Sequence, residues 1–275
     1  MSSFGVRLQQ GFKWKGQLCV GIDPSLEQLH SWGLPQSAEG ARTFAMAILD
    51  ASTDLVAVVK PQVAFFEQFG PDGFRILAEV LKEASSRNLL VIADAKRGDI
   101  GSTMDGYSKA WLSREAVFLC DALTVSPYLG LESLHQTVEL ALANNRGVFI
   151  LAATSNPEAS SLQSAIASGS SVARSVLDFA SRHSQGEIGS IGVVIGATVD
   201  YRALGIDVTQ PTNLPVLVPG FGSQGAELSK AASILKTFAE VSICSVSRSV
   251  AGSDKEGLSK RIATANAELE IGLRA

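Results

Sequence analysis

Residues 89–100 read LLVIADAKRGDI, and this segment indicates the fold most directly. Its first half is a continuous apolar run, which is typical of a parallel strand that is covered on both faces. Charged side chains begin only at Asp94 and continue with Lys96, Arg97 and Asp99. In a β/α barrel, apolar strands give way to functional residues at their carboxyl ends. The segment therefore predicts one strand of such a barrel together with part of its active site.

Seven other apolar runs repeat this pattern, and segments with helical periodicity lie between most of them. The predicted strands are residues 17–22, 55–59, 89–94, 122–126, 148–152, 191–195, 216–218 and 241–246. The predicted helices are residues 72–87, 103–114, 131–144, 172–183, 226–237 and 256–273. Eight strands, each followed by a helix or a helix-length insert, predict an α/β protein, a single (β/α)8 TIM-type barrel domain over residues 1–275. A doubly wound sheet is the alternative, because a sequence pattern does not show that a sheet closes.

The composition is that of a globular chain. Hydrophobic residues make up 46% of the 275 residues and charged residues only 18%, which excludes intrinsic disorder. The 23 basic and 27 acidic residues give a net charge of −4, which argues against a nucleic-acid partner. Cys19, Cys120 and Cys244 form no motif and are expected to be reduced and structural. We find no signal sequence and no membrane-length apolar run, so we expect a soluble, cytoplasmic protein with no membrane partner.

Charged residues at two neighbouring strand ends are candidates for an active site. Asp94 and Lys96 are two residues apart, so in a strand both side chains point to the same face. Lys60, which follows the second strand, could join them. A structural ion pair is the alternative interpretation, because opposite charges in contact offset the cost of burying each other. The presence of Lys60, Asp94, Lys96 and Asp99 in two adjacent units favours a catalytic site.

The segment GFGSQG, residues 220–225, formally matches the GxGxxG pattern of dinucleotide-binding proteins. It follows the seventh strand instead of opening a βαβ unit, so this interpretation is weak. Capture of a phosphate group fits better, because glycines let backbone amides approach an anion and the loops after strands seven and eight form the usual phosphate site of the barrel. Arg248, just past strand eight, would supply a planar cation with several donors. A tight turn beside a surface arginine is the alternative.

The segment DAKRGDI, residues 94–100, closely resembles the DxKxxDI signature of the orotidine 5′-phosphate decarboxylase family. VKPQVAFFE, residues 59–67, and PGFGSQG, residues 219–225, are similar to the longer, mainly bacterial subfamily. The resemblance extends over nearly the whole chain. It implies a carboxy-lyase that converts orotidine 5′-monophosphate to UMP and CO2 in de novo pyrimidine biosynthesis, without a metal or an organic cofactor. It also implies a homodimer with active sites shared between subunits.

The resemblance further implies a role for each site residue. Lys96 would donate the proton to C6 of the pyrimidine, and Asp94 would lie beside the substrate carboxylate. Asp99 of the partner subunit would complete a network with Lys60. The implied catalytic residues are Lys60, Asp94, Lys96 and Asp99, and the implied substrate-binding residues are Asp23, Thr103, Ser126, Pro219, Gly220, Gln224 and Arg248. Asp23, together with Lys60, would hold the ribose hydroxyls. Ser126 and Pro219 would contact the pyrimidine, and Gln224 and Arg248 would hold the phosphate. Thr103 would reach across the subunit interface.

The reaction explains why an ammonium group is needed. Loss of CO2 leaves negative charge on a ring carbon, and a fixed cation at Lys96 can stabilise that charge and then protonate the carbon. The loop after strand five or strand seven is expected to close over the substrate. Two features depart from the family pattern: Ser247 stands where many relatives have glycine, and the serine-rich segment 154–171 is longer than in compact relatives.

Two other functions remain as alternatives. Metal-dependent sugar-phosphate decarboxylases and aldolases share the barrel, but they need oxygen ligands for Mg2+. We find no extra carboxylate for that role, and His30, His135 and His183 have no ligand-spaced partners. The chain could also be a nucleotide-binding barrel without catalytic activity, because a fold does not imply a function.

Overall fold

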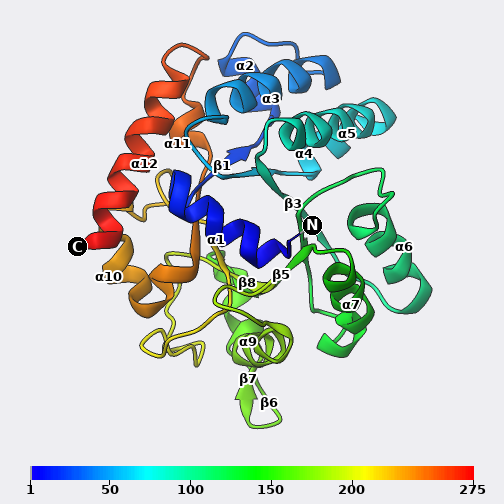
Figure 1. Cartoon of the computed structure of the whole chain (residues 1–275), viewed down its shortest axis with the longest axis vertical. Helices are drawn as coiled ribbons and strands as arrows, with labels where there is room; N and C mark the ends of the chain where they lie inside the picture. Colours follow the sequence, from blue (N-terminus) through cyan, green and yellow to red (C-terminus); the bar gives the residue numbers. More distant parts are fainter. Residues whose placement is uncertain (1) are drawn as a thin grey trace.

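The computed structural model describes residues 2–275 and shows a closed barrel of eight parallel strands in the order β1-β10-β9-β8-β5-β4-β3-β2 (Figure 1). The barrel strands are β1 (Leu18–Ile22), β2 (Val58–Pro61), β3 (Leu90–Arg97), β4 (Ala122–Val125), β5 (Gly147–Ala153), β8 (Ile191–Ile195), β9 (Val216–Val218) and β10 (Ser242–Val246). Strand β1 pairs with both β2 and β10, which closes the sheet. The predicted barrel is confirmed, and the doubly wound alternative is wrong.

Helices surround the barrel, and almost every strand residue is buried between them and the barrel interior. The α-helices are α1 (Phe4–Lys15), α2 (Leu26–Ser31), α3 (Ala38–Ser52), α4 (Ala64–Glu67), α5 (Gly70–Ser86), α6 (Gly101–Leu112), α7 (His135–Ala143), α8 (Ser160–Gln163), α9 (Val172–His183), α10 (Ala231–Leu235), α11 (Arg248–Ala251) and α12 (Leu258–Arg274). Short 3-10 helices are η1 (Leu131–Leu134), η2 (Pro157–Ala159), η3 (Leu228–Lys230) and η4 (Lys236–Val241). None of the helices in residues 2–275 is both long and apolar enough to cross a membrane.

All eight predicted strands are present, and two of them have ends that differ from the prediction by more than one residue. Strand β2 begins at Val58 and not at residue 55, because the amides of Leu55 and Val56 still bond to the Ser52 carbonyl at the end of α3. Strand β3 continues past Asp94, because its pairing with β4 resumes at Arg97 after an irregular stretch. Two predicted helices are interrupted by 3-10 turns: residues 131–144 form η1 and α7, and residues 226–237 contain η3, α10 and part of η4.

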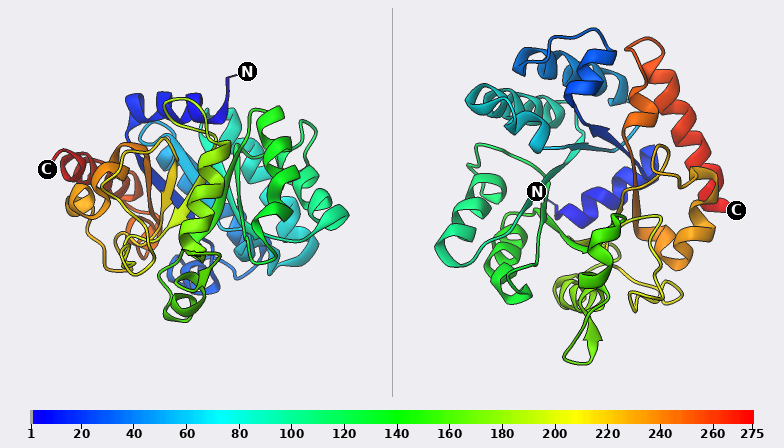
Figure 2. Two further views of the ribbon diagram at one scale, coloured as in Figure 1. Left: turned by 90° about the horizontal axis from the view of Figure 1, so that it is seen from below. Right: turned by 180° about the vertical axis from the view of Figure 1, so that it is seen from behind.

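Helix α1 covers the amino-terminal end of the barrel (Figure 2). The Phe4 ring packs edge-on against the ring of Phe149 in β5, with centroids 5.9 Å apart. Arg7 of α1 and Arg146 both pair with Asp121, whose other carboxylate oxygen accepts a 2.8 Å hydrogen bond from the Val91 amide. These contacts close the end of the barrel that lies away from the strands' carboxyl ends.

The segment between β5 and α9 is folded into short elements. It contains η2, α8 and an antiparallel hairpin of β6 (Ile166–Ala167) and β7 (Ser170–Ser171) that projects from the barrel at the bottom of Figure 1.

Cys19, Cys120 and Cys244 are buried and unpaired. Burial raises the pKa of the Cys19 and Cys120 thiols to about 12. They belong to the packed interior, as the sequence predicted.

Candidate active site

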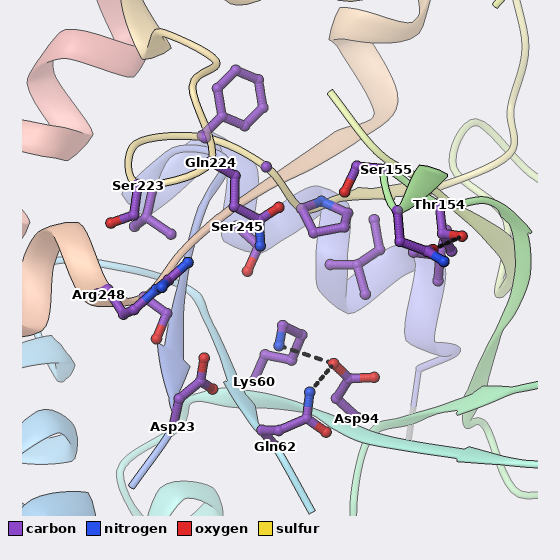
Figure 3. A pocket seen from close by; sticks show the side chains of 18 of the residues that line it. Asp23, Lys60, Gln62, Asp94, Thr154, Ser155, Ser223, Gln224, Ser245 and Arg248 are labelled. Atoms are coloured by element: carbon purple, nitrogen blue, oxygen red, sulfur yellow. Dashed lines mark hydrogen bonds and ion pairs between the residues drawn. The ribbon is translucent and has the colours of Figure 1, made fainter. Parts of the chain in front are cut away.

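A cavity of about 270 Å³ opens at the carboxyl ends of the strands (Figure 3). Its walls come from loops and strand ends on opposite sides of the barrel, so it depends on the closed fold. Eight of the eleven residues singled out from the sequence line it: Asp23, Lys60, Asp94, Lys96, Pro219, Gly220, Gln224 and Arg248.

Asp94 is the centre of the polar network in this cavity. Its Oδ1 accepts hydrogen bonds from Lys96 Nζ at 2.6 Å and from the Thr124 hydroxyl at 2.9 Å. Its Oδ2 accepts from Lys60 Nζ at 3.1 Å and from Gln62 Nε2 at 3.0 Å. Each carboxylate oxygen therefore has two donors, which is the condition under which a carboxylate can stay ionised when buried.

The charges of this network stabilise one another. Burial alone would raise the pKa of Asp94, but the Lys60 and Lys96 ammonium groups outweigh it and hold the pKa well below its usual range. Burial alone would lower the pKa of Lys60, but Asp94 and Asp23 raise it above its usual range. Asp94 is therefore a carboxylate and Lys60 an ammonium group throughout the neutral pH range.

Lys96 differs from Lys60 in its exposure. The Lys60 side chain is only 8% exposed, whereas the Lys96 side chain is 44% exposed. Lys96 has a left-handed backbone with φ of +49°, at the irregular stretch of β3. Its backbone amide donates to the Thr124 hydroxyl at 3.0 Å. This backbone position leaves a fixed ammonium group at the open side of the Asp94 carboxylate, where a bound molecule can meet it.

Asp23 presents an unused acceptor to the same cavity. Its Oδ1 is buried, yet it has no hydrogen-bond partner among residues 2–275. The Asp23 side chain as a whole is only half-buried and lines the cavity, so the rest of its carboxylate can accept a hydrogen bond from a ligand. A hydroxyl group is a donor of suitable size.

The other side of the cavity is suited to an anion. Figure 3 shows Arg248 and Ser223 on the side opposite to Asp94. Arg248 makes no ion pair within the described part of the chain, so its guanidinium group is free. The amides of Ser223 and Gln224 likewise bond to no other group of residues 2–275. Free amides beside an arginine form an anion site.

The glycine loop owes this geometry to Gly222. Its φ is +74°, and a Cβ there would lie 2.5 Å from the Ser249 hydroxyl oxygen. Any larger residue would push the loop away from α11.

Comparison with known proteins agrees with this geometry. The model of the orotidine 5′-phosphate decarboxylase / HUMPS family matches residues 16–260. The chain belongs to this family. A decarboxylase of that name from Corynebacterium glutamicum is 46% identical over 259 residues, which is 90% of each chain. One from Streptomyces coelicolor is 44% identical over 230 residues, or 82% of this chain and 81% of the relative.

The likeness extends to solved structures. The crystal structure of a putative orotidine 5′-phosphate decarboxylase from Streptomyces avermitilis superimposes with a TM-score of 0.94 at 40% sequence identity. The superposition covers 100% of this chain and 97% of that one. The family description also includes the HUMPS enzymes, but these relatives all carry the decarboxylase name.

Three residues expected from the family pattern lie outside this cavity. Ser126 lines a second cavity, of about 710 Å³, which shares Lys96 with the first. Asp99 is half-buried, and its carboxylate accepts a 2.8 Å hydrogen bond from the neighbouring Ile100 amide. Thr103 is exposed on α6. A single chain therefore does not bring Asp99 to Asp94.

Two residues of the network escaped the sequence analysis. Gln62 is two positions beyond Lys60 and so shares its face of the chain, a spacing that could have indicated it. Thr124 is a fully buried polar residue within the apolar strand β4. Thr154, Ser155 and Asn156 also line the cavity, which gives the start of the long segment 154–171 a place in the site.

Within residues 2–275 no group of three or more His, Cys, Asp or Glu side chains is arranged to hold a metal ion.

Proposed function

We propose that the chain converts orotidine 5′-monophosphate to UMP and CO2, as a carboxy-lyase of de novo pyrimidine biosynthesis. The observation that carries this proposal is the Lys60–Asp94–Lys96 network, in which one lysine is buried and the other extends into an open cavity. Family membership and the names of the relatives support the same reaction. We further propose that residues 1–275 act as one domain.

In the proposed mechanism, Lys96 serves the reacting carbon. When the C–CO2 bond breaks, its electron pair stays on C6 of the pyrimidine. The Lys96 ammonium group, oriented by its 2.6 Å bond to Asp94, stabilises this charge and then transfers a proton to C6. The cation is in place before the reaction begins, so little reorganisation is needed as charge develops. Asp94 keeps the ammonium group oriented.

The ribose and phosphate would fix the substrate. The Asp23 carboxylate accepts a hydrogen bond from a ribose hydroxyl, and Lys60 donates to a ribose oxygen. Arg248, Gln224 and the free loop amides hold the phosphate on the side opposite to Asp94 (Figure 3). Because these contacts lie away from the reacting carbon, their binding energy can be used to orient the substrate.

The pyrimidine ring would lie between these two ends. Pro219 and Gly220 line the cavity there, and Ser126 lies beyond Lys96 in the adjoining cavity. We propose that Pro219 and Ser126 contact the ring. The two cavities together leave room for a ring and its carboxylate beside Lys96.

We also propose a homodimer in which Asp99 and Thr103 enter the site of the other subunit. Both residues belong to the surface formed by the end of β3 and the start of α6. Large apolar side chains are exposed beside them, with Ile100 59% and Tyr107 36% exposed. Exposed apolar side chains that gather around polar site residues favour a protein interface.

The decisive test is the ultraviolet absorbance of orotidine 5′-monophosphate with EDTA-treated protein. We expect loss of the orotate chromophore and formation of UMP without added metal. Activity that returns only with Mg2+ would favour the metal-dependent members of the barrel superfamily. Binding of UMP without any turnover would favour the non-catalytic barrel and contradict the proposal.

A further inference from the structure

Helix α11 carries Arg248, but it is too short to hold its own shape. It spans only four residues, Arg248–Ala251, and an isolated helix of that length is not stable in water. Its Arg248 carbonyl accepts a hydrogen bond from the Gly252 amide at 3.0 Å, but its other carbonyls have no partner within the helix. The position of Arg248 at the cavity must therefore be set by contacts from elsewhere in the fold.

Arg261, in the first turn of α12, supplies most of these contacts. Its Nε donates to the Val250 carbonyl at 2.8 Å, and one terminal nitrogen donates to the Ala251 carbonyl at 2.7 Å. The same nitrogen donates to the Asp254 carbonyl at 2.6 Å, and the other terminal nitrogen donates to the Glu256 carbonyl. One guanidinium group thus binds four carbonyls at the end of α11 and in the turn that follows.

The backbone around this group leaves little free space. A Cβ on Gly252 would lie 2.9 Å from the Arg261 Cζ. The Gly252 carbonyl in turn accepts hydrogen bonds from Gln28 Nε2 at 2.7 Å and from Trp32 Nε1 at 3.3 Å. The carboxyl end of α11 is therefore held from two sides, by α12 and by α2 with its following residue.

Helix α11 also contacts the glycine loop. Gly222 lies against Ser249, as described above, so a shift of α11 would move Arg248 and disturb the loop that carries Gln224. A contiguous path of contacts leads from Arg261 through the α11 carbonyls to both parts of the anion site.

We propose that Arg261 is a positioning residue for phosphate binding: it fixes α11 so that Arg248 and the glycine loop meet the substrate phosphate. The inference rests on the proposed function, because it assumes that Arg248 binds that phosphate. Arg261 does not line the cavity of about 270 Å³ and acts only through α11. A planar guanidinium group can bind four carbonyls at once, whereas a lysine has one nitrogen and cannot.

A double-mutant cycle tests this proposal. The dissociation constant for UMP is measured for the wild type, Arg248→Ala, Arg261→Gln and the double variant, at a temperature where thermal melting shows all of them folded. We expect Arg261→Gln to weaken UMP binding about tenfold, a typical coupling between contacting residues. In the Arg248→Ala background the same change should have a clearly smaller effect, because only the part that acts through the glycine loop remains. Arg274→Gln is the control, because this arginine lies at the far end of α12 and, among residues 2–275, forms its ion pair with Glu270 alone.

The outcomes separate the inference from the proposed function. If Arg248→Ala weakens UMP binding but the effects of the two substitutions multiply, Arg261 acts independently and the inference is wrong. An unchanged affinity of the Arg261→Gln variant for UMP would also show that the inference is wrong. If Arg248→Ala itself leaves UMP binding unchanged, the proposed phosphate site is wrong and the inference falls with it. Should Arg261→Gln not fold, Arg261→Lys takes its place in the cycle and is judged by the same coupling.

Discussion

Replacing Asp94 with asparagine should reveal how strongly the buried network depends on charge. The asparagine side chain has nearly the same size but no charge, and one of its two polar atoms would become a donor facing other donors. The substitution would weaken or remove the hydrogen bonds that the Asp94 carboxylate accepts from Lys60 at 3.1 Å, Lys96 at 2.6 Å, Gln62 at 3.0 Å and Thr124 at 2.9 Å.

The loss of stability can be estimated from the exposure of the two lysines. Removing one partner of a buried ion pair costs about 3–5 kcal/mol. Lys60, at 8% side-chain exposure, belongs to this class, whereas Lys96 at 44% is screened by water and adds little. We therefore expect the free energy of unfolding to fall by about 3 kcal/mol at pH 7. At roughly 2–4 °C per kcal/mol, Tm would fall by about 6–12 °C.

The pKa shifts of Lys60 and Asp94 determine how the stability difference between wild type and variant changes with pH. In the wild type the pKa of Lys60 is raised above its ordinary 10.5, so its contribution to stability is complete below that pH and is lost only above it. The pKa of Asp94 is lowered from 3.8, so its contribution is complete above that pH and is lost in stronger acid. In the variant the two contributions of Asp94 are lost while burial still acts on Lys60, so the pKa of Lys60 falls. The difference between wild type and variant should therefore be largest from about pH 5 to pH 8 and should shrink towards about pH 10.

Urea unfolding followed by circular dichroism at about pH 5, 7 and 9.5 measures this difference. Asp200→Asn is the matched control, because Asp200 is exposed and, among residues 2–275, its carboxylate accepts only from the nearby Arg202 and Ala203 amides, as an asparagine can. The control should lose less than about 1 kcal/mol. A loss in Asp94→Asn as small as in the control, or one that is constant across this pH range, would refute the electrostatic argument.

The remaining predictions concern activity. Lys96→Ala should abolish turnover while leaving the fold intact, as judged by thermal melting, and substantial residual activity would exclude Lys96 as the proton donor. Arg248→Ala should weaken substrate binding by about 1.5–3 kcal/mol, the value of a charged hydrogen bond, measured as KM and as UMP affinity. An unchanged KM and kcat would exclude its role. Mixing inactive Asp99→Asn with inactive Lys96→Ala protein should restore part of the activity, since one site of a mixed dimer would have both native residues. No recovery despite proven subunit exchange would contradict a shared site.

The barrel could be predicted from the sequence because its strands are continuous apolar runs ending in polar residues. The α-helices α1, α2, α3, α4, α8 and α11 were missed, although the first three of them each begin after a serine whose side chain caps the helix. These serines are Ser3, Ser25 and Ser37. Helix α1 precedes the first strand, and α2 and α3 lie between β1 and β2. Their serine caps are local signals that a search for periodicity does not detect.

The candidate site was predictable where it depended on strand ends and less so elsewhere. Lys60 and Asp94 could be paired because they end adjacent strands of a parallel sheet. The left-handed backbone of Lys96 could not be foreseen, because it arises from the irregular pairing of β3 with β4. The roles of Asp99 and Thr103 follow from family resemblance, and they stay predictions.

The three buried thiols allow the opening of the barrel to be followed by chemical modification. Cys19 lies on β1 and Cys244 on β10, the first and last strands, whose pairing closes the sheet. Only the thiolate reacts, and burial raises the pKa of Cys19 to about 12. A thiol reagent can therefore modify this cysteine only after the two strands separate. Cys120 precedes β4, away from that closure. Equal labelling rates at all three positions would mean that the barrel opens as one cooperative unit. Faster labelling of Cys19 and Cys244 would mean that the pairing between the first and last strands opens more readily than the rest of the barrel.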